Sequence, residues 1–328
     1  MSILEHSHRA ASYEKVHNET KSLFVELLGV PETHDVLFMQ GGASAQFALV
    51  PMNLLAGKSA DYVITGAWSE KAFKEAKVVG KAREAGTGKV GESYTRVPTQ
   101  SELSLDPEAA YVHITTNNTI MGTQFHYVPE TGNVPLIADA SSDILWKPTD
   151  ISKYGVLYAG AQKNIGPAGI TIVVIRKDLL ERVPTTIPSI FRYTTVAKDN
   201  SLHNTIPTFS MYMIRNVLRW VKEQGGAKAM EERNLKKAAT LYGAIDANPD
   251  FFRCPVEKAS RSVMNPVFRL PSEELEKKLI DEAKKAGFVG IKGHRSVGGI
   301  RVSMYNPTEP ASVESFVSYI EDFAKKNS

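Results

Sequence analysis

The sequence has a single cysteine among its 328 residues, and this scarcity limits the chemistry to expect. One thiol, Cys254, cannot form an intramolecular disulfide, which suits a reducing compartment. Long apolar runs are missing as well, since the longest are strand-sized and well short of the roughly 20 residues of a membrane span. The first ten residues lack the basic and then apolar pattern of a signal peptide. We therefore expect a soluble, cytoplasmic protein without a membrane partner.

Charge of one sign is also scarce. Thirty-nine Lys and Arg residues face 36 Asp and Glu residues, which leaves a formal net charge of +3. This balance gives no reason to expect a nucleic-acid partner. Hydrophobic residues make up 42% of the chain, near the globular average, so a large core can form. Because the chain is longer than one domain usually is, we expect two domains.

Strand-like and helix-like segments alternate along the first two thirds of the chain. The apolar spacing of residues 12–28 predicts a helix that Gly29 and Pro31 end. The strands expected after it cover residues 35–40, 61–66, 110–116, 134–141, 156–161 and 170–176, with helices over 41–55 and 67–80. Repeated strand, crossover and strand units indicate an α/β fold with a mostly parallel sheet covered by helices.

The pattern changes near residue 227. A long charged helix is followed by a strand over 263–270, a helix over 272–287, a strand pair over 289–296 and 298–306, and a closing helix. We predict a large domain over 1–226 and a smaller α+β C-terminal domain over 227–328. Ligands of open α/β sheets bind beyond the carboxyl ends of the strands, so candidate functional residues are expected at those ends.

Polar or glycine-rich signals follow several of the predicted strands. Residues 41–44, Gly-Gly-Ala-Ser, open a helix and form a natural phosphate seat, although an ordinary turn has the same pattern. Lys163 lies in a glycine-rich loop between two apolar strands, and Asp139 ends the strand before them. Lysine amines form Schiff bases with carbonyl compounds such as pyridoxal phosphate. That cofactor needs a lysine, a carboxylate, a phosphate seat and a stacking surface, for which Trp68 is a candidate. Taken alone, Asp139 is more often a cap and Trp68 more often core.

One motif is discounted. Residues 86–91, Gly-Thr-Gly-Lys-Val-Gly, match the spacing of a dinucleotide-binding loop. They follow residues 75–85, which we expect to be helical, and no helix is expected after them. Since a dinucleotide loop needs a strand before it and a helix after it, we predict a surface turn.

The stretch YAGAQKNIGPAG, residues 158–169, strongly resembles the cofactor-lysine motif of the phosphoserine aminotransferases, which are fold-type I, class V pyridoxal-phosphate enzymes. The resemblance extends over nearly the whole chain in family order. Its blocks are SHR (7–9), FMQGGASAQFALVPMNLL (38–55), GAWSEKA (66–72), ADASSDI (138–144), NTIPTFSMY (204–212) and IKGHRSVGGIRVSMYN (291–306). The resemblance implies a homodimer with shared active sites, pyridoxal 5′-phosphate as cofactor, and no metal.

The resemblance also implies a role for each cofactor-binding residue. Lys163 would form the Schiff base and carry the proton, and Asp139 would hold the pyridine nitrogen. Trp68 would stack on the ring, and Thr119 would bond near the ring oxygen. The phosphate would be bound by Ala43 and Ser44 with Gln162 beside it, and by Asn204 and Thr205 of the neighbouring subunit.

The implied reaction is a ping-pong transfer of the amino group of L-glutamate to 3-phosphohydroxypyruvate, a step of L-serine biosynthesis that gives O-phospho-L-serine and 2-oxoglutarate. Arginine forks suit such anions. Arg301 would hold the α-carboxylate. The phosphate and the side-chain carboxylate would be held by His8, Arg9, His294 and Arg295. Without the family blocks, the two His-Arg pairs would be taken as surface coincidence.

One departure and several alternatives accompany this interpretation. Family members carry a few dozen residues before the SHR block, whereas this sequence has six. We therefore expect the family's N-terminal segment to be lacking and substrate affinity to suffer more than cofactor binding. A related phospho-keto acid of vitamin B6 synthesis is an alternative acceptor, and a cofactor-binding form with reduced activity is another. A cysteine desulfurase would need a mobile catalytic cysteine, and Cys254 is more typical of packing. Alanine–glyoxylate-type transaminases would not need the extra basic cluster.

Overall fold

A seven-stranded sheet forms the centre of the computed structural model, which describes residues 2–327. The strand order is β1-β11-β10-β9-β6-β2-β3. Strand β11 is antiparallel to both of its neighbours, and every other adjacent pair is parallel. The expected mixed, mostly parallel sheet is therefore confirmed. Its strands are β1 (His34–Gln40), β2 (Ser59–Ile64), β3 (Lys81–Thr87), β6 (Val112–Thr115), β9 (Leu136–Asp139), β10 (Val156–Gly160) and β11 (Ile170–Arg176).

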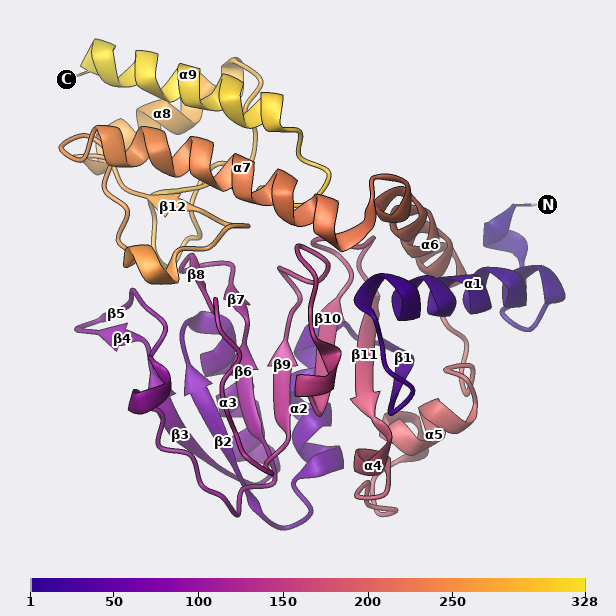
Figure 1. Cartoon of the computed structure of the whole chain (residues 1–328). Helices are drawn as coiled ribbons and strands as arrows, with labels where there is room; N and C mark the ends of the chain where they lie inside the picture. The colour runs from indigo at the N-terminus through magenta and orange to yellow at the C-terminus, as the bar shows by residue number, and fades with distance from the viewer. Residues whose placement is uncertain (1, 328) are drawn as a thin grey trace.

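Helices cover both faces of this sheet (Figure 1). Helices α1 (Ala11–Leu28) and α6 (Thr208–Glu223) pack on one face, and α2 (Gly42–Leu54) and α3 (Ala67–Val79) on the other. Because successive strand residues point to opposite faces, β1 sends Val36 and Phe38 into the first core and Leu37 and Met39 into the second. The result is a three-layer α/β/α arrangement.

A second lobe lies over the edge of the sheet where the parallel strands end (Figure 1). It contains α7 (Gly226–Ala247), β12 (Val267–Phe268), α8 (Glu273–Lys285), β13 (Ile300–Arg301) and α9 (Pro310–Asn327). A third core cluster joins these elements. We propose that a domain boundary lies at residues 226–227, a division that this separate core supports.

The strands expected in this lobe are mostly irregular. The strand predicted over 289–296 was wrong, because this stretch contributes only a bridge between Lys292 and Ile300. Gly298 and Gly299 both have φ of +71°, so the chain turns tightly instead of extending. A Cβ on Gly293 would lie 1.9 Å from the Gly298 carbonyl oxygen. This close approach folds residues 293–299 into a loop above the sheet.

The helix expected to continue through residues 75–85 was also wrong in part. Helix α3 stops at Val79, and β3 begins at Lys81 as an edge strand that pairs only with β2 among the described strands. Its exposed charged side chains are also typical of a surface helix, which is why a helix was predicted. The glycine motif at 86–91 therefore does follow a strand, but it leads into the hairpin of β4 (Lys89–Val90) and β5 (Ser93–Tyr94). The helix that a dinucleotide site needs is replaced by this hairpin.

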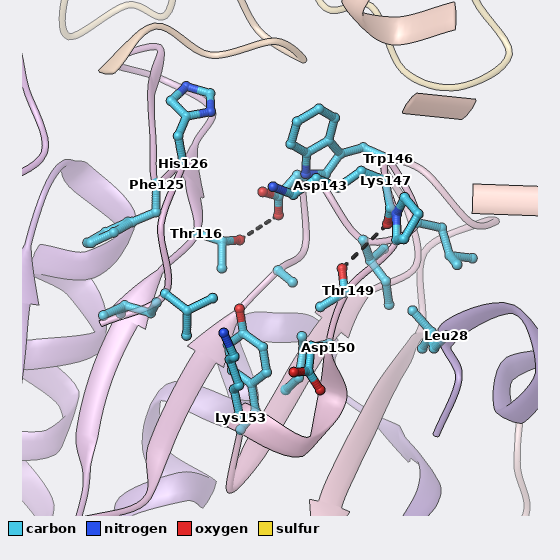
Figure 2. Close-up of a pocket in the computed structure, with 18 of the residues that line it drawn as sticks. Leu28, Thr116, Phe125, His126, Asp143, Trp146, Lys147, Thr149, Asp150 and Lys153 are labelled. Atoms are coloured by element: carbon cyan, nitrogen blue, oxygen red, sulfur yellow. Dashed lines mark hydrogen bonds between the residues drawn. The ribbon is translucent and has the colours of Figure 1, made fainter. Parts of the chain in front are cut away.

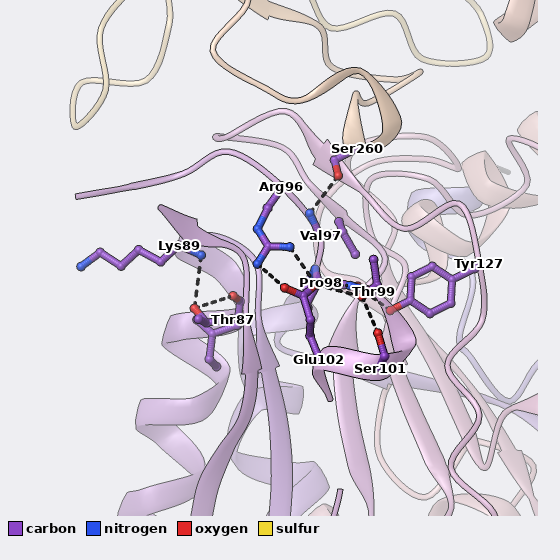
Figure 3. A network of polar contacts seen from close by, with 11 residues as sticks. Thr87, Lys89, Arg96, Val97, Pro98, Thr99, Ser101, Glu102, Tyr127 and Ser260 are labelled. Atoms are coloured by element: carbon purple, nitrogen blue, oxygen red, sulfur yellow. Dashed lines mark hydrogen bonds and ion pairs between the residues drawn. The ribbon is translucent and has the colours of Figure 1, made fainter. Parts of the chain in front are cut away.

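A polar network secures the chain after this hairpin (Figure 3). The Arg96 guanidinium donates to both oxygens of Glu102 at 2.8 and 2.6 Å, and the Thr99 N–H donates to the same carboxylate at 2.7 Å. The Val97 N–H donates to Ser260 Oγ at 2.9 Å, which ties the sheet edge to the second lobe.

The remaining elements are short. They are η1 (Ile3–Glu5), η2 (Gln100–Glu102), β7 (Asn117–Asn118), β8 (Thr123–Gln124), η3 (Ile151–Lys153), α4 (Lys177–Leu180), η4 (Ser189–Phe191), α5 (Tyr193–Lys198) and η5 (Lys258–Ser260). Of the helices within residues 2–327, none combines the length and the apolar character needed to cross a membrane.

Candidate active site

Lys163 lies in the loop between β10 and β11, at the edge of the sheet beneath the second lobe. Its Nζ donates to Thr119 Oγ1 at 2.6 Å and stands 5.2 Å from the centroid of the Trp68 ring. Burial lowers the pKa of the amine, an effect that the Asp139 carboxylate opposes and the Arg301 charge reinforces. A lysine with a lowered pKa is the kind that forms Schiff bases.

Asp139 is the last residue of β9 and is buried. Its Oδ1 accepts hydrogen bonds from the N–H and the hydroxyl of Ser141, at 2.9 and 2.5 Å. Ser141 Oγ also accepts from the Gly160 N–H at 3.0 Å, so it joins the ends of β9 and β10. Burial raises the pKa of Asp139, while Ser141 and Lys163 lower it. A cation held against this carboxylate would keep it ionised.

The start of α2 offers backbone N–H groups to an anion. Gly41, at the N-cap, has φ of +97° and gives no side-chain cap, so the first N–H groups of the helix are available. A Cβ on Gly160 would lie 2.9 Å from Gln162 Oε1 and 3.2 Å from the Ala43 nitrogen. The absence of a side chain there lets Gln162 approach the helix start. Ala43, Ser44 and Gln162 thus lie in the same neighbourhood.

Trp68 stands in the first turn of α3, after a close crossing of two loops. A Cβ on Gly66 would lie 2.5 Å from Asn118 Oδ1, so glycine is needed for the loop before Thr119 to pack there. The indole Nε1 of Trp68 is buried and has no hydrogen-bond partner among residues 2–327. The ring, Thr119 and Lys163 converge on one spot.

Positive charge gathers beside this spot. Arg301, in β13, has a buried Nε without a hydrogen-bond partner in the described chain. Burial lowers the pKa of His294, and the charges of Arg301, Arg295 and Lys71 lower it further. His294 Nδ1 and Ser296 Oγ share a hydrogen bond of 2.7 Å. Arg301 is close enough to Lys163 to lower the pKa of the amine, and His294 and Arg295 lie near Arg301. Their predicted roles in substrate binding stay predictions.

Two sets of predicted residues lie elsewhere in the chain. His8 and Arg9 follow η1, which packs on α6. Arg9 Nε donates a hydrogen bond of 3.2 Å to His8 Nε2. Figure 1 shows this N-terminal end on the far side of the molecule from β12. Asn204 lies with Gly41 in an apolar groove of about 480 Å³, and the Thr205 carbonyl accepts from Gln40 Nε2. The predicted contact of Asn204 and Thr205 with the cofactor phosphate of a neighbouring subunit stays a prediction, as does the substrate binding predicted for His8 and Arg9.

Sequence reasoning missed several polar residues of this site. Lys71 lies one turn after Trp68, with its Nζ 4.4 Å from the ring, and helical i, i+3 spacing was the available signal. Ser141 follows Asp139 by two positions, a spacing typical of a carboxylate that caps its own turn. Thr116 and Asp143 meet only in the folded chain and left no local signal.

The donor set fits pyridoxal phosphate. The site brings together an amine, an aromatic face with a free N–H, a buried carboxylate, an uncapped helix start and a cluster of cations. These are the groups that the cofactor's aldehyde, ring, ring nitrogen and phosphate and an anionic substrate would need. Lys163, Trp68, Asp139 and Ala43 would hold it.

Comparison with known proteins gives a consistent result. The sequence profile of the class-V aminotransferases matches residues 2–316. The chain is 52% identical over its full length to the phosphoserine aminotransferase of Lysinibacillus sphaericus (strain C3-41), covering 90% of that protein. The structure of the phosphoserine aminotransferase from Bacillus circulans subsp. alkalophilus superposes with a TM-score of 0.97 at 49% identity, over all of this chain and 91% of that one. A phosphoserine aminotransferase structure that reports radiation damage of its Schiff base matches over the same shares of the two chains at 48% identity, also with a TM-score of 0.97. The chain therefore belongs to the class-V aminotransferase family, among the phosphoserine aminotransferases.

Proposed function

We propose that this enzyme transfers the amino group between L-glutamate and 3-phosphohydroxypyruvate with pyridoxal 5′-phosphate, giving O-phospho-L-serine and 2-oxoglutarate. The main support for this proposal is the environment of the Lys163 amine, which has a lowered pKa and lies between Thr119 and Trp68 with Asp139 nearby. The family membership established above makes the chain an aminotransferase, and the arrangement supports the specific reaction.

The chain's own residues hold and orient the reactants. When bound, the cofactor supplies a carbonyl for Schiff-base formation and a ring that withdraws electrons from the substrate α-carbon. Asp139 would keep the ring nitrogen protonated, and Trp68 would cover one face of the ring. The start of α2 would bind the phosphate, with Gln162 beside it. The Lys163 amine would carry the proton between the substrate α-carbon and the cofactor's C4′ carbon within each half-reaction, in opposite directions in the two.

Substrate selection follows from charge. Both amino donor and acceptor carry at least two anionic groups. The second lobe offers Arg301 beside the lysine, with His294, Arg295 and Lys71 of α3 gathered near Arg301. Arg301 fits the α-carboxylate that both substrates share, because its guanidinium has an unused buried N–H. The other cations fit the phosphate of one substrate and the side-chain carboxylate of the other.

We also propose a homodimer with shared active sites, which is supported by the position of His8 and Arg9: they follow η1, which packs on α6, across the molecule from β12 (Figure 1). The apolar groove next to Gly41 supports this proposal: Ile190 and Phe191, which line it, remain 45% and 41% exposed. A second copy packed on this face would bury them and bring Asn204 and Thr205 near a second site. A cytoplasmic location is part of the same proposal and is supported by the single cysteine.

A coupled assay with glutamate and 3-phosphohydroxypyruvate tests the reaction. We expect a yellow protein whose visible band shifts on adding glutamate and that then forms phosphoserine. A band that responds to glutamate without phosphoserine formation would favour the vitamin B6 substrate or a form with reduced activity. A colourless protein that takes up no pyridoxal phosphate would refute the proposal. Cys254 gives no support to a desulfurase, since burial raises the pKa of its thiol.

A further inference from the structure

One carboxyl group beside the site has no part in the proposed reaction. Asp143 lies four residues after Asp139, in the turn that follows β9, and is only 6% exposed. It faces Thr116 at one side of a cavity of about 330 Å³ that lies beside the sheet (Figure 2). Because Asp143 is buried so near the Asp139 carboxylate, its protonation state affects the charge of the site.

The contacts of Thr116 favour a proton on Asp143. Thr116 Oγ1 lies 2.5 Å from Asp143 Oδ1 and 3.0 Å from the carbonyl oxygen of Asp139. A carbonyl can only accept, and the hydroxyl has one proton to give. Both contacts are hydrogen bonds when Asp143 donates to Thr116 and Thr116 donates to the carbonyl. An ionised Asp143 can only accept a hydrogen bond, so Thr116 would donate its single hydroxyl proton to Asp143. No proton would then be left for a hydrogen bond to the Asp139 carbonyl.

The other oxygen of Asp143 meets a neutral donor. Its Oδ2 accepts from Gln124 Nε2 at 3.1 Å, and Gln124 Oε1 accepts from the Val263 N–H of the second lobe at 2.8 Å. The Val263 contact fixes the amide orientation, so its nitrogen must face Asp143. No ion pair in the described chain reaches either oxygen of Asp143. An ionised carboxylate here would be buried without a paired cation, which is costly.

Every charged group around Asp143 can be named. Burial is the largest cause of the rise in the pKa of Asp143 from 3.8 to about 7. The hydrogen bonds with Thr116 and Gln124 oppose this rise, the Asp139 carboxylate adds to it, and Lys147 opposes it. Lys147 directs its Nζ over the Trp146 ring at 4.9 Å. The other titratable groups that sense Asp143 are Lys163, Tyr154 and Tyr305, and His126, Asp150 and Lys153 line the same cavity.

We propose that Asp143 is a positioning residue that keeps its proton while the enzyme works, so that Asp139 is the only charged carboxylate behind the cofactor ring. This inference rests on the proposed function. Two nearby carboxylates repel, so ionisation of Asp143 would favour the neutral form of Asp139 and weaken its hold on a protonated ring nitrogen. The protonated form also completes the chain of bonds from Val263 through Gln124 and Thr116 to the end of β9.

Two substitutions and a matched control test the proton. Asp143→Asn reproduces the neutral acid, since its N–H can donate to Thr116 and its carbonyl can accept from Gln124. Asp143→Val has a similar size without these bonds. Asp150→Asn is the control, because Asp150 borders the same cavity and is exposed. Infrared spectra of the holoenzyme at pH 6 are expected to show a protonated carboxyl band in wild type and Asp150→Asn that is missing from Asp143→Asn.

Cofactor affinity supplies the second readout. At pH 6 we expect Asp143→Asn to bind pyridoxal phosphate like wild type and Asp143→Val to bind about tenfold more weakly, a factor that corresponds to about 1.4 kcal/mol. Between pH 7 and 9, wild type should lose more affinity than Asp143→Asn. A band that persists in Asp143→Asn, or an Asp143→Asn variant that fails to fold or binds as weakly as Asp143→Val, would overturn the inference. Should no variant take up the cofactor, the proposed function fails, while infrared spectra of the cofactor-free protein still decide whether Asp143 carries the proton.

Discussion

Two carboxyl groups of this chain are driven in opposite directions by their surroundings. At the exposed sheet edge, Arg96 and Thr99 hold the pKa of Glu102 at about 2, well below its usual 4.5. Beside the active site, burial among neutral partners raises the pKa of Asp143 to about 7. The edge stabilises a charge with a cation in solvent, whereas the site removes a charge because solvent is absent. A pKa shift caused by an ion pair at the surface and one caused by burial in the interior therefore have different physical origins and opposite signs.

Two lysines, one buried in the site and one exposed, should differ in the same way, and substitution of the buried lysine should have the largest effect on activity. Lys163→Ala removes the buried amine, and we expect turnover to fall by at least about 10²–10⁴-fold, the contribution of a positioned proton carrier. Lys153→Ala removes an exposed lysine of η3 and should leave turnover near wild type. Steady-state rates and circular dichroism of both variants provide the measurement. Wild-type-like turnover by a folded Lys163→Ala would refute the role of Lys163.

Arg301 should give the next largest effect. Arg301→Lys keeps the charge but loses the planar fork. We therefore expect kcat/KM for both substrates to fall, by a factor that corresponds to a loss of about 1.5–3 kcal/mol of transition-state stabilisation. Arg253→Lys is the matched control, since Arg253 lies in the same cavity as Arg301 on an exposed stretch. An equal loss in both variants would mean that a specific fork at Arg301 does not select the substrates.

The interior carboxyl group should dominate the stability profile near neutrality. Because folding raises the pKa of Asp143, its contribution is fully present below pH 3.8 and is lost as pH rises through about 7. Each pH unit in that window removes up to about 1.4 kcal/mol from the free energy of unfolding. Asp143→Asn cannot titrate, so its melting temperature should fall less than that of wild type between pH 5 and 8. Parallel profiles for the two proteins would contradict this prediction.

The contrast also explains what the sequence could predict. Lys163, Asp139 and the 41–44 turn each follow a buried strand, and the carboxyl ends of parallel strands meet at one edge, so their convergence followed from local patterns. The partners of Asp143 come from residues 116 and 124, and the orientation of Gln124 depends on residue 263. No local spacing encodes contacts between such distant segments. Edge strand β3 was missed for a related reason: it is half-exposed and charged, so tertiary pairing, not its own periodicity, makes it a strand.

Substitution of Glu102 at the exposed sheet edge should have the smallest effect of the changes predicted here. Folding lowers the pKa of Glu102, so its contribution is present above pH 4.5 and is lost as pH falls toward about 2, the reverse of Asp143. Solvent and salt screen an ion pair at this surface, so Glu102→Gln should change the melting temperature at pH 7 by no more than about 2 °C, with a smaller change in high salt. Glu108→Gln, an exposed glutamate on the same stretch, is the control. A larger loss in Glu102→Gln that salt leaves untouched would show that this network, through the Val97 bond to Ser260, holds the second lobe in place by packing and hydrogen bonding and not by charge.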